Sequence, residues 1–563
     1  MGKKRRLPIG VENFAEICSE DIYYVDKTGF MKELWVNKGK VNLFTRPRRF
    51  GKTLNMSMLR HFFEVGCDKT LFENLQIAKD RTFCEACRGQ FPVISISLKG
   101  VQALSYETAR GMLARTINEE TERISKNMQP DKCSEKQKSI LKDFQDIKMD
   151  EGSLMDSLRA LSSIMQQYYE KKVIILIDEY DVPLNSAYEN GYYDQMVSLL
   201  RNFLSQALKT NDNLEFAVLT GCLRVAKESI FTGLNNFKIF SITDVSCARW
   251  FGFTGQEVQK MLEYYGISQH YDSVRKWYDG YRFGDQELYC PWDVICYCSD
   301  LLTNPAIQPR DYWINTSGNA IVQRFVTLAD RTTQREIEAL IAGESITKNI
   351  RLDLTYGELY DSIENLWSIL FATGYLTLRG DANGHELSLA IPNLEVRDIF
   401  ITQIKEWFRE VTYQDKPRLD SFCQAFRRGD AKAVEEQFRS YLVRTISIRD
   451  TTTKSKKENF YHGILLGLLA YDRDWVVSSN AESGDGYSDI LIEIEEEDTG
   501  IIIEIKYAEN ADLNAACQAA MAQIKERDYS ERLRREGITK VIAFGIACYK
   551  KRCRVVCENI SFL

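Results

Sequence analysis

The sequence contains only four histidines, no long apolar run and no excess of positive charge. A zinc site would need histidines or a second cysteine pair near a pair such as Cys84 and Cys87, and the sequence has neither there. The 15 cysteines are therefore interpreted as free thiols of a reducing cytosol. The longest apolar runs, 173–177 and 464–470, are far shorter than the roughly 18 residues that cross a membrane.

The formal net charge of -7 argues against a wholly basic nucleic-acid-binding protein, although a binding site is a local patch rather than a sum. Residues 1–8 contain a basic cluster that no apolar stretch follows, so they are not expected to be a secretory signal. The chain has 563 residues, 44% of them hydrophobic and 27% charged, which is the composition of a globular protein with about three or four domains. We therefore expect a soluble, cytoplasmic, multidomain protein without a membrane span.

The first 250 residues alternate apolar runs with segments whose apolar residues recur at helical spacing. This alternation predicts an α/β domain with a mostly parallel sheet covered on both faces. The expected strands are 41–45, 92–98, 173–177, 215–220 and 238–242, and the expected helices are 54–65, 106–123 and 152–170. The polar stretch 127–139 is expected to be a surface loop within this domain.

Residues 251–448 are predominantly helical in pattern and rich in aromatic side chains. Within them, 366–408 predicts a helix, a hairpin and a second helix, an order that is compatible with a winged helix and with other α+β segments. The polar and basic stretch 449–457 is the expected linker to a compact α/β region. That region is expected to contain helices 459–471 and 510–526 and strands 475–479, 488–495, 501–507 and 540–545.

Residues 44–53, FTRPRRFGKT, lie between an expected strand and an expected helix. The triplet Gly51-Lys52-Thr53 matches the end of a phosphate-binding loop, G-x-x-x-x-G-K-T/S. Gly51 would let backbone N–H groups approach phosphate oxygens, Lys52 would reach the β and γ phosphates, and the Thr53 hydroxyl would bind Mg²⁺. The first glycine of the pattern is replaced by Arg46, so the alternative is a basic turn that enters a helix.

A second motif supports nucleotide binding. The apolar run 173–177 ends in Asp178 and Glu179, and ligands of open α/β sheets bind at the carboxyl ends of the strands. Asp178 would hold Mg²⁺, and Glu179 would orient or deprotonate an attacking water. The next expected strand ends near Thr220 and Arg224, which are candidates for sensing the γ-phosphate or are ordinary turn residues.

Acidic residues and a lysine near the C-terminus predict a second site. Glu504 and Lys506 are two residues apart on a strand-like apolar run, so they project from the same face, and Asp489 lies on the preceding strand. Two carboxylates and a lysine suit a Mg²⁺-dependent phosphodiesterase, and the alternative is a simple Glu–Lys ion pair. Weaker candidates for the same site are Glu458, His462, Glu482 and Gln523.

Several strings spread over the chain resemble the bacterial AAA-ATPase-like family. They are LPIG at 7–10, YVDKT at 24–28, RPRRFGKT at 46–53, LIDEYD at 176–181, FGFT at 251–254 and WYDGYRFG at 277–284. Members of this family typically carry a C-terminal, restriction-endonuclease-like domain of the PD-(D/E)XK nuclease superfamily. Combined with the boundaries from the sequence pattern, the resemblance implies an ATPase domain over 1–250 and a nuclease-like domain over 449–563. The region 251–448 between them is expected from its pattern to be helical and compatible with a winged helix.

The resemblance also implies roles for individual residues. It assigns the nucleotide roles to Lys52, Thr53, Asp178 and Glu179, with Thr53 and Asp178 as the expected metal ligands. The loop residues Arg48, Arg49 and Gly51 are further candidates for nucleotide binding, from the sequence of the loop itself. Glu179 is the expected catalytic residue of the ATPase, and Asp489, Glu504 and Lys506 are those of the nuclease, with Asp489 and Glu504 as its metal ligands. Ser488 stands where the nuclease signature usually has proline, a position that tolerates other residues.

These motifs favour an ATP- and Mg²⁺-dependent nuclease that acts on DNA. One alternative is a nucleotide-dependent switch whose C-terminal domain binds nucleic acid without cleaving it, and another is an oligomeric ATPase that acts on protein partners. The ATP- and Mg²⁺-dependent nuclease could also be a homo-oligomer. The acidic net charge predicts contact with DNA through local basic patches, such as Lys454, Lys456 and Lys457 at the entrance of the C-terminal region.

Overall fold

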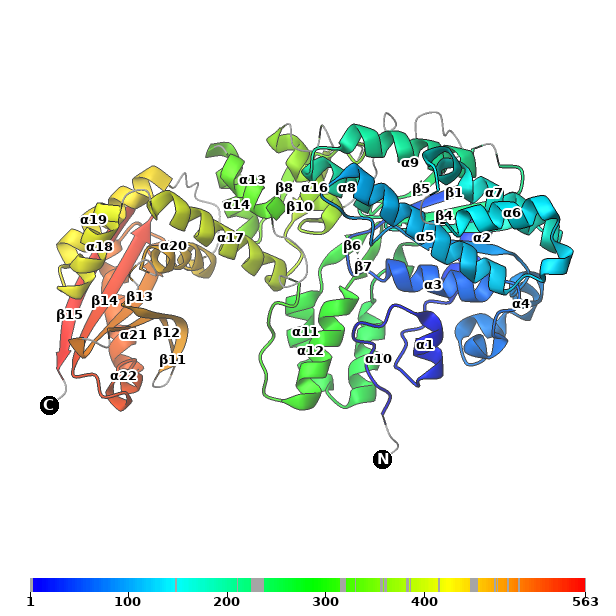
Figure 1. The fold of residues 1–563 in the computed structure, drawn as a ribbon. Coiled ribbons are helices and arrows are strands. Elements are labelled where there is room, and N and C mark those ends of the chain that lie inside the picture. The colour runs from blue at the N-terminus through cyan, green and yellow to red at the C-terminus, as the bar shows by residue number, and fades with distance from the viewer. Residues whose placement is uncertain are drawn as a thin grey trace. The chain divides into compact units, whose positions relative to one another are not determined.

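The computed structural model (Figure 1) divides into two compact units, each described by itself below. The first comprises Met1–Ser317 and Thr347–Val396, and the second comprises Gly318–Ile346 and Arg397–Leu563. The structure describes residues 4–146, 149–209, 211–223, 237–313, 320–329, 331–354, 358, 362–380, 384, 386–413, 416–445, 454–469, 472, 474–483, 486–494 and 497–561. No helix in these ranges is long and apolar enough to span a bilayer.

A five-stranded sheet forms the core of the first unit. Its order is β2-β3-β4-β1-β5, every neighbouring pair is parallel, and all five strands were expected from the sequence. The strands are β1 (Val41–Thr45), β2 (Val93–Ser97), β3 (Val173–Asp178), β4 (Leu214–Gly221) and β5 (Phe237–Phe240). Their continuous apolar runs are buried because helices pack on the sheet, which confirms the α/β class.

Helices precede, separate and follow these strands in the first part of the chain. They are α1 (Phe14–Ser19), α2 (Gly29–Asn37), α3 (Lys52–Phe63), α4 (Arg81–Cys87), α5 (Tyr106–Lys126), α6 (Glu135–Phe144), α7 (Glu151–Tyr169), α8 (Val182–Glu189) and α9 (Tyr193–Leu208). The expectation of a loop over the whole of 127–139 was wrong at its end. Helix α6 begins there because the side chains of Ser134 and Gln137 form a reciprocal capping box.

Short helices and two small sheets complete the first unit. These elements are α10 (Gly255–Tyr265), α11 (Tyr271–Tyr278), β6 (Tyr281–Phe283), β7 (Gln286–Leu288), α12 (Pro291–Thr303), β8 (Ile346–Asn349), α16 (Ile363–Thr373), β9 (Thr377–Leu378) and β10 (Glu386–Ala390), with α17 (Leu394–Tyr413) following. The described parts of 363–413 run helix, antiparallel pair, helix, in the expected order. The winged helix itself stays a prediction.

The second unit contains a mixed sheet of order β11-β12-β13-β14-β15, in which only β13 and β14 are parallel. Its strands are β11 (Val476–Ser483), β12 (Gly486–Ile494), β13 (Thr499–Tyr507), β14 (Lys540–Tyr549) and β15 (Arg552–Ser561), the last of which was not expected. Its helices are α13 (Ala320–Leu328), α14 (Arg331–Ile341), α18 (Lys416–Arg427), α19 (Ala431–Thr445), α20 (Lys454–Leu469), α21 (Leu513–Glu526) and α22 (Glu531–Arg535).

The end of the expected linker 449–457 is helical. Residues 454–457 form the first turn of α20, and 449–453 lie outside the described residues. The middle region 251–448 contributes residues to both compact units. The three-part division at 250 and 448 stays a prediction.

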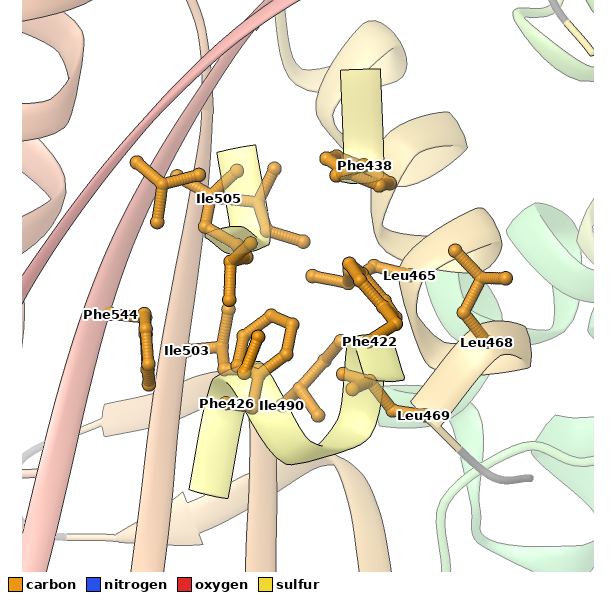
Figure 2. Close-up of a cluster of buried hydrophobic side chains, with 14 of the residues drawn as sticks. Phe422, Phe426, Phe438, Leu465, Leu468, Leu469, Ile490, Ile503, Ile505 and Phe544 are labelled. Atoms are coloured by element: carbon orange, nitrogen blue, oxygen red, sulfur yellow. The ribbon is translucent and has the colours of Figure 1, made fainter. Parts of the chain in front are cut away.

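Alternate residues of β13 face two different cores. Ile501, Ile503 and Ile505 pack with α18, α19 and α20 in one apolar cluster, part of which is drawn in Figure 2. Ile502 packs with residues of α21 and α22 on the other side. Since side chains alternate along a strand, Glu504 and Lys506 leave β13 on the same side as Ile502.

The cluster in Figure 2 predicts that α18 is part of the folded core of the second unit. Phe426 is fully buried there, and its ring centre lies 4.7 Å from that of Phe544 on β14. Phe426→Ala should lower the free energy of unfolding of this unit by about 3–5 kcal/mol, measured by urea denaturation. Val443→Ala, at an exposed position of α19, should change it by less than about 0.5 kcal/mol. Equal stability of the two variants would contradict the assignment.

Candidate nucleotide and nuclease sites

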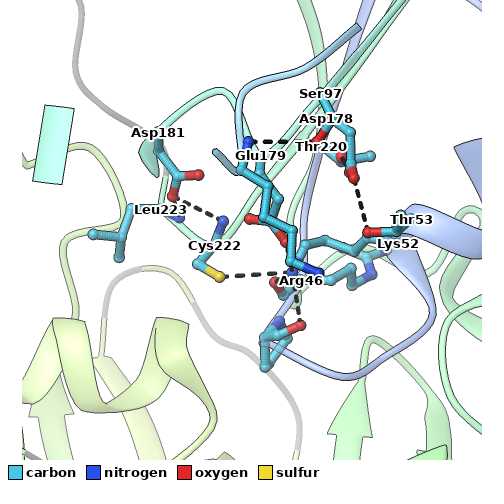
Figure 3. Close-up of polar contacts among 12 residues, drawn as sticks. Arg46, Lys52, Thr53, Ser97, Asp178, Glu179, Asp181, Thr220, Cys222 and Leu223 are labelled. Carbon is cyan, nitrogen blue, oxygen red and sulfur yellow. Dashed lines mark hydrogen bonds and ion pairs between the residues drawn. The ribbon is translucent and has the colours of Figure 1, made fainter. Parts of the chain in front are cut away.

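The phosphate-binding loop predicted from the sequence connects β1 to α3. Gly51 has a φ of 78°, a left-handed conformation that favours glycine, and it turns the chain directly into the first residue of α3, Lys52. The Lys52 ammonium donates hydrogen bonds of 3.1 Å to the carbonyl oxygens of Arg46 and Pro47 (Figure 3). The lysine is thus folded over its own loop, where a phosphate would lie.

Asp178 ends β3 and connects this strand to helix α3 and strand β4 (Figure 3). The Thr53 hydroxyl donates a 2.8 Å hydrogen bond to one carboxylate oxygen of Asp178, and the Thr220 hydroxyl donates to the other. Thr220 belongs to β4, which lies between β1 and β3. Burial raises the pKa of Asp178, the charge of Glu179 adds to this, and the two hydroxyl donors oppose it. The sequence candidates Thr53, Asp178 and Thr220 therefore meet in one cluster.

Glu179 follows β3 and has a φ of 53°, in the left-handed region. Its carboxylate lies 3.4 Å from the Lys52 nitrogen. Burial by itself would lower the pKa of Lys52, but Cys222, Glu179 and other acidic groups nearby raise it overall. Lys52 is therefore protonated, and it lies close to Glu179, the acidic residue that the sequence predicts to be catalytic.

Asp181 has a structural role that sequence reasoning missed. Its carboxylate accepts 2.9 Å hydrogen bonds from the backbone N–H groups of Cys222 and Leu223, which follow β4 (Figure 3). Burial is the largest cause that raises the pKa of Asp181 to about 6. The signal was the group of three acidic residues at and after the end of β3, Asp178, Glu179 and Asp181, of which only the first two were assigned roles. Arg224, the other candidate near this loop, lies outside the described residues.

A pocket of about 620 Å³ opens beside the phosphate-binding loop. Its polar side contains Arg48, Arg49, Gly51, Lys52, Thr53 and Glu179. Its lining also contains apolar and aromatic residues, which include Tyr23, Val25, Trp250, Phe253, Met261 and Ile295. A volume of this size, lined by both charged and apolar groups, suits a ligand with a planar apolar part and an anionic part.

The three arginines of the loop have different environments. Arg48 is exposed and lines the pocket. Arg49 also lines it, but its guanidinium donates a 3.1 Å hydrogen bond to the carbonyl oxygen of Tyr312 and lies 4.0 Å from the carboxylate of Asp293. Arg49 is therefore anchored to a neighbouring segment of the first unit in this structure.

Arg46 faces away from the pocket. It is fully buried, donates to the carbonyl oxygens of Thr45 (2.9 Å) and Phe240 (2.7 Å), and lies 5.1 Å and 5.5 Å from the ring centres of Phe251 and Phe283. Burial lowers its pKa to about 10. The residue that replaces the first glycine of the loop pattern thus anchors the end of β1 to β5 and an aromatic cradle. It does not add to the positive charge that faces the pocket.

The C-terminal candidates also come together. Asp489 on β12 accepts a 2.7 Å hydrogen bond from the backbone N–H of Ile505, and Lys506 donates a 2.8 Å hydrogen bond to Glu504. The Glu504 side chain is only 2% exposed, whereas that of Lys506 is 19% exposed. Burial and the neighbouring charge of Asp489 raise the pKa of Glu504 to about 7, against the opposing effect of Lys506. The strand is buried rather than half-exposed, but the Glu504–Lys506 ion pair of the alternative is present, so the nuclease role of these residues stays a prediction.

Two weaker candidates, both on α20, support these strands. Glu458 accepts a 3.0 Å hydrogen bond from the backbone N–H of Tyr507, and a ring nitrogen of His462 lies 2.7 Å from the carbonyl oxygen of Asp489. Because that partner is a carbonyl oxygen, the His462 nitrogen is the donor. Gln523 instead donates to the Tyr529 hydroxyl, 3.0 Å away. The side chain of Glu482 lies outside the described residues.

The described residues contain no group of three or more His, Cys, Asp or Glu side chains arranged to hold a metal ion. A divalent cation would therefore be held by two carboxylates together with other oxygen ligands, as Mg²⁺ commonly is. One oxygen of Glu504 is buried without a hydrogen-bond partner, and a cation beside Asp489 and Glu504 would satisfy it. At the nucleotide site, the Thr53 hydroxyl and Asp178 provide the corresponding oxygen ligands.

Comparison with known proteins matches the N-terminal and the C-terminal parts of the chain to two different families. Residues 8–231 match a family described as predicted AAA-ATPase, and residues 456–558 match the PD-(D/E)XK nuclease superfamily. The two matches confirm the architecture expected from the sequence. An uncharacterized protein in the vnfD 5′ region of Azotobacter chroococcum mcd 1 is 28% identical over 403 residues, which cover 70% of this chain and 69% of that protein.

The buried carboxyl group of Glu504 predicts a stability that depends on pH. Its ordinary pKa of 4.5 rises to about 7 on folding, so the folded state holds the proton more tightly than the unfolded state. Stability should fall as the pH rises from about 4.5 to 7, by an amount on the order of 3 kcal/mol. Glu504→Gln keeps an oxygen for Lys506 but cannot ionise. In EDTA, it should therefore unfold at higher urea concentration than the wild type at pH 8 and show little gain at pH 5.

The control for this measurement is Glu509→Gln, at an exposed position just after β13. This variant should follow the wild type at both pH values. A Glu504→Gln variant that is less stable than the wild type at pH 8 would contradict the burial of an uncompensated carboxylate.

Proposed function

We propose that this chain, which joins an AAA-ATPase-like domain to a domain of the PD-(D/E)XK nuclease superfamily, binds and hydrolyses ATP and cleaves DNA with a Mg²⁺-dependent site. The observation that carries the proposal is the same arrangement in both units. In each, a lysine contacts a carboxylate near the carboxyl end of a buried strand, beside a further carboxylate. Such an arrangement fits the binding of phosphate together with a divalent cation.

In the first unit, the triphosphate would lie over the loop that ends in Gly51. Lys52 would exchange the carbonyl oxygens of Arg46 and Pro47 for phosphate oxygens, which carry more negative charge and bind an ammonium more strongly. Arg48, exposed beside the same pocket, would add a second cation. The nucleobase would lie against the apolar and aromatic residues of the pocket lining, such as Trp250 and Phe253.

Mg²⁺ would be held by Thr53 and Asp178, and when bound it neutralises charge on the β and γ phosphates. Glu179 would accept a proton from the attacking water or orient that water, since Lys52 holds its carboxylate near the phosphate position. Thr220 keeps one oxygen of Asp178 occupied and so fixes the orientation of that carboxylate. A nucleotide in the pocket would change the contacts of Lys52, Thr53 and Asp178 together.

In the second unit, Asp489 and Glu504 would hold the cation, which when bound lowers the pKa of a coordinated water. Lys506, which is partly exposed beside Glu504, would contact the scissile phosphate and steady the attacking water. The N–H of Ile505 fixes the carboxylate of Asp489, and His462 fixes the strand that carries it. ATP binding in the first unit would regulate this cleavage.

Two substitutions test the nucleotide site. Lys52→Ala should weaken ATP binding at least tenfold, measured by isothermal titration calorimetry, because the phosphates lose their buried cation. Glu179→Gln should bind ATP with nearly wild-type affinity and lose at least 100-fold in turnover, because the amide cannot accept the proton. Lys32→Ala, a surface variant that breaks an ion pair with Asp80, is the control and should match the wild type. A Glu179→Gln variant with an unchanged rate of hydrolysis would overturn the assignment.

Asp489→Asn and Lys506→Ala test the nuclease site. Each should reduce Mg²⁺-dependent cleavage of plasmid, linear and single-stranded DNA by at least 100-fold, with and without ATP, while far-UV circular dichroism stays unchanged. Lys525→Ala, on the surface of α21, should cleave like the wild type. DNA binding without any Mg²⁺-dependent cleavage by the wild type would favour the alternative of a recognition module.

A further inference from the structure

Two buried acids next to Arg49 of the phosphate-binding loop have no part in either proposed reaction. Asp293 lies in the first turn of α12 and Glu395 in the first turn of α17, and both side chains are fully buried. All three residues belong to the first unit. We call Asp293 and Glu395 the acid pair. Buried carboxyl groups need a proton or a cation as a partner, and the acid pair has one of each.

The proton of the acid pair is on Glu395. One oxygen of Glu395, Oε1, accepts hydrogen bonds from the backbone N–H groups of Tyr312 (2.5 Å) and Trp313 (2.8 Å). Burial, the charge of Asp293 and the hydrogen bond between the two acids together raise the pKa of Glu395 to about 10. The proton therefore lies on the other oxygen, Oε2, and is donated to Asp293. The acid pair carries a single negative charge.

The cation is Arg49, which uses few of its donors in this position. Its guanidinium lies 4.0 Å from Asp293, beyond hydrogen-bond distance, and donates one hydrogen bond of 3.1 Å to the carbonyl oxygen of Tyr312. Its Nη2 atom is buried and has no hydrogen-bond partner within the part of the chain that the structure describes. Its φ of 70° is in the left-handed region, which is unfavourable for residues other than glycine. Arg49 is therefore held in a strained position with incomplete hydrogen bonding.

The same guanidinium belongs to the nucleotide pocket. Arg49 lines this pocket together with Lys52 and Trp292, and the ring centre of Trp292 lies 5.4 Å from the guanidinium carbon. A phosphate group offers two oxygens to one guanidinium, and a triphosphate carries more negative charge than the acid pair. A triphosphate in the pocket and the acid pair therefore compete for one cation.

We propose that the acid pair is an internal competitor of the nucleotide, which holds Arg49 in the ligand-free protein until a triphosphate in the pocket draws Arg49 away. This inference rests on the proposed function of the pocket and adds a means of regulating it. Arg49 is then both a phosphate contact and the residue that reports occupancy of the pocket to other elements.

Departure of Arg49 changes the contacts at the start of α17. The carbonyl oxygen of Tyr312 loses its donor, and Asp293 keeps a buried charge without its cation. Glu395 is hydrogen-bonded to both of these residues, so the change reaches α17. That helix begins with residues of the first unit and continues, from Arg397, with residues of the second. The acid pair thus links occupancy of the pocket to a helix that continues into the second unit.

The direction of one change in affinity tests the competition. Asp293→Asn/Glu395→Gln keeps the shape of the acid pair but removes its charge, so Arg49 is free for the phosphates. The full chain with this double change should bind ATP about threefold to tenfold more tightly than the wild type, measured by isothermal titration calorimetry, because the competent position of Arg49 is more populated before binding. Arg49→Ala should weaken ATP binding at least about threefold. In the Arg49→Ala background, the double change should alter the affinity by less than about twofold.

Asp300→Asn is the matched control. Asp300 lies on the same helix, α12, and accepts a 2.7 Å hydrogen bond from the Tyr312 hydroxyl and one of 2.6 Å from Arg310. This variant should bind ATP within about twofold of the wild type. Unchanged or weaker binding by the acid-pair variant, or an equal gain in the Arg49→Ala background, would overturn the competition alone. A wild type that binds no ATP would overturn the proposed nucleotide site as well.

Hydrogen exchange of the wild type tests the link to α17 without any substitution in the acid pair. The N–H groups of Tyr312 and Trp313 both donate to Glu395, so their exchange reports whether these contacts persist. A saturating non-hydrolysable ATP analogue should speed exchange of this peptide by about threefold or more. In Arg49→Ala the exchange should be fast with and without the analogue. Equal rates for the free and the saturated wild type would refute the release of Arg49.

Discussion

A charge that is removed from water at the end of a buried strand needs a partner, and both candidate sites are built around this requirement. In the first unit, the 3.4 Å contact between Lys52 and Glu179 joins the loop after β1 to the residue after β3. In the second, the 2.8 Å contact between Lys506 and Glu504 lies within β13 itself. A second carboxylate lies beside each pair and has its own hydrogen-bond donors. Asp178 accepts from two hydroxyl groups, and Asp489 accepts from a backbone N–H.

The scaffolds that hold these pairs differ. The first unit arranges residues from three parallel strands, so its site depends on the order β3-β4-β1 and on the connections that follow each strand. Arg46 stabilises one of these connections by occupying an aromatic cradle and two carbonyl oxygens, which explains how the loop keeps its shape without the first glycine of the usual pattern. The second unit needs only two adjacent strands, and α20 fixes their positions through Glu458 and His462.

Both sites retain polar atoms that their own neighbours do not satisfy. One oxygen of Glu504 has no hydrogen-bond partner, and Lys52 binds carbonyl oxygens that are weaker acceptors than phosphate. Buried polar groups without strong partners lower the stability of the ligand-free protein, and such groups are common at functional sites. The two arginines that line the pocket differ in the same respect. Arg48 is exposed at the pocket, whereas Arg49 already contacts Tyr312 and Asp293.

The sequence alone determined the elements and most of the residues of each site. A run of five apolar residues marked β3, and shorter apolar stretches marked β1 and β13. The polar residues that follow or interrupt these stretches marked Lys52, Asp178 and Glu504, because the burial and the chemistry of a segment depend on residues that are neighbours in the sequence. Only the tertiary structure decided which distant residues meet. The contact of Thr220 with Asp178, the cradle of Arg46, the packing of α18 under the nuclease-like sheet and the approach of Arg49 to Asp293 all depend on strand order and helix docking. Local periodicity carries no information about these pairings, since many folds can bury the same apolar faces.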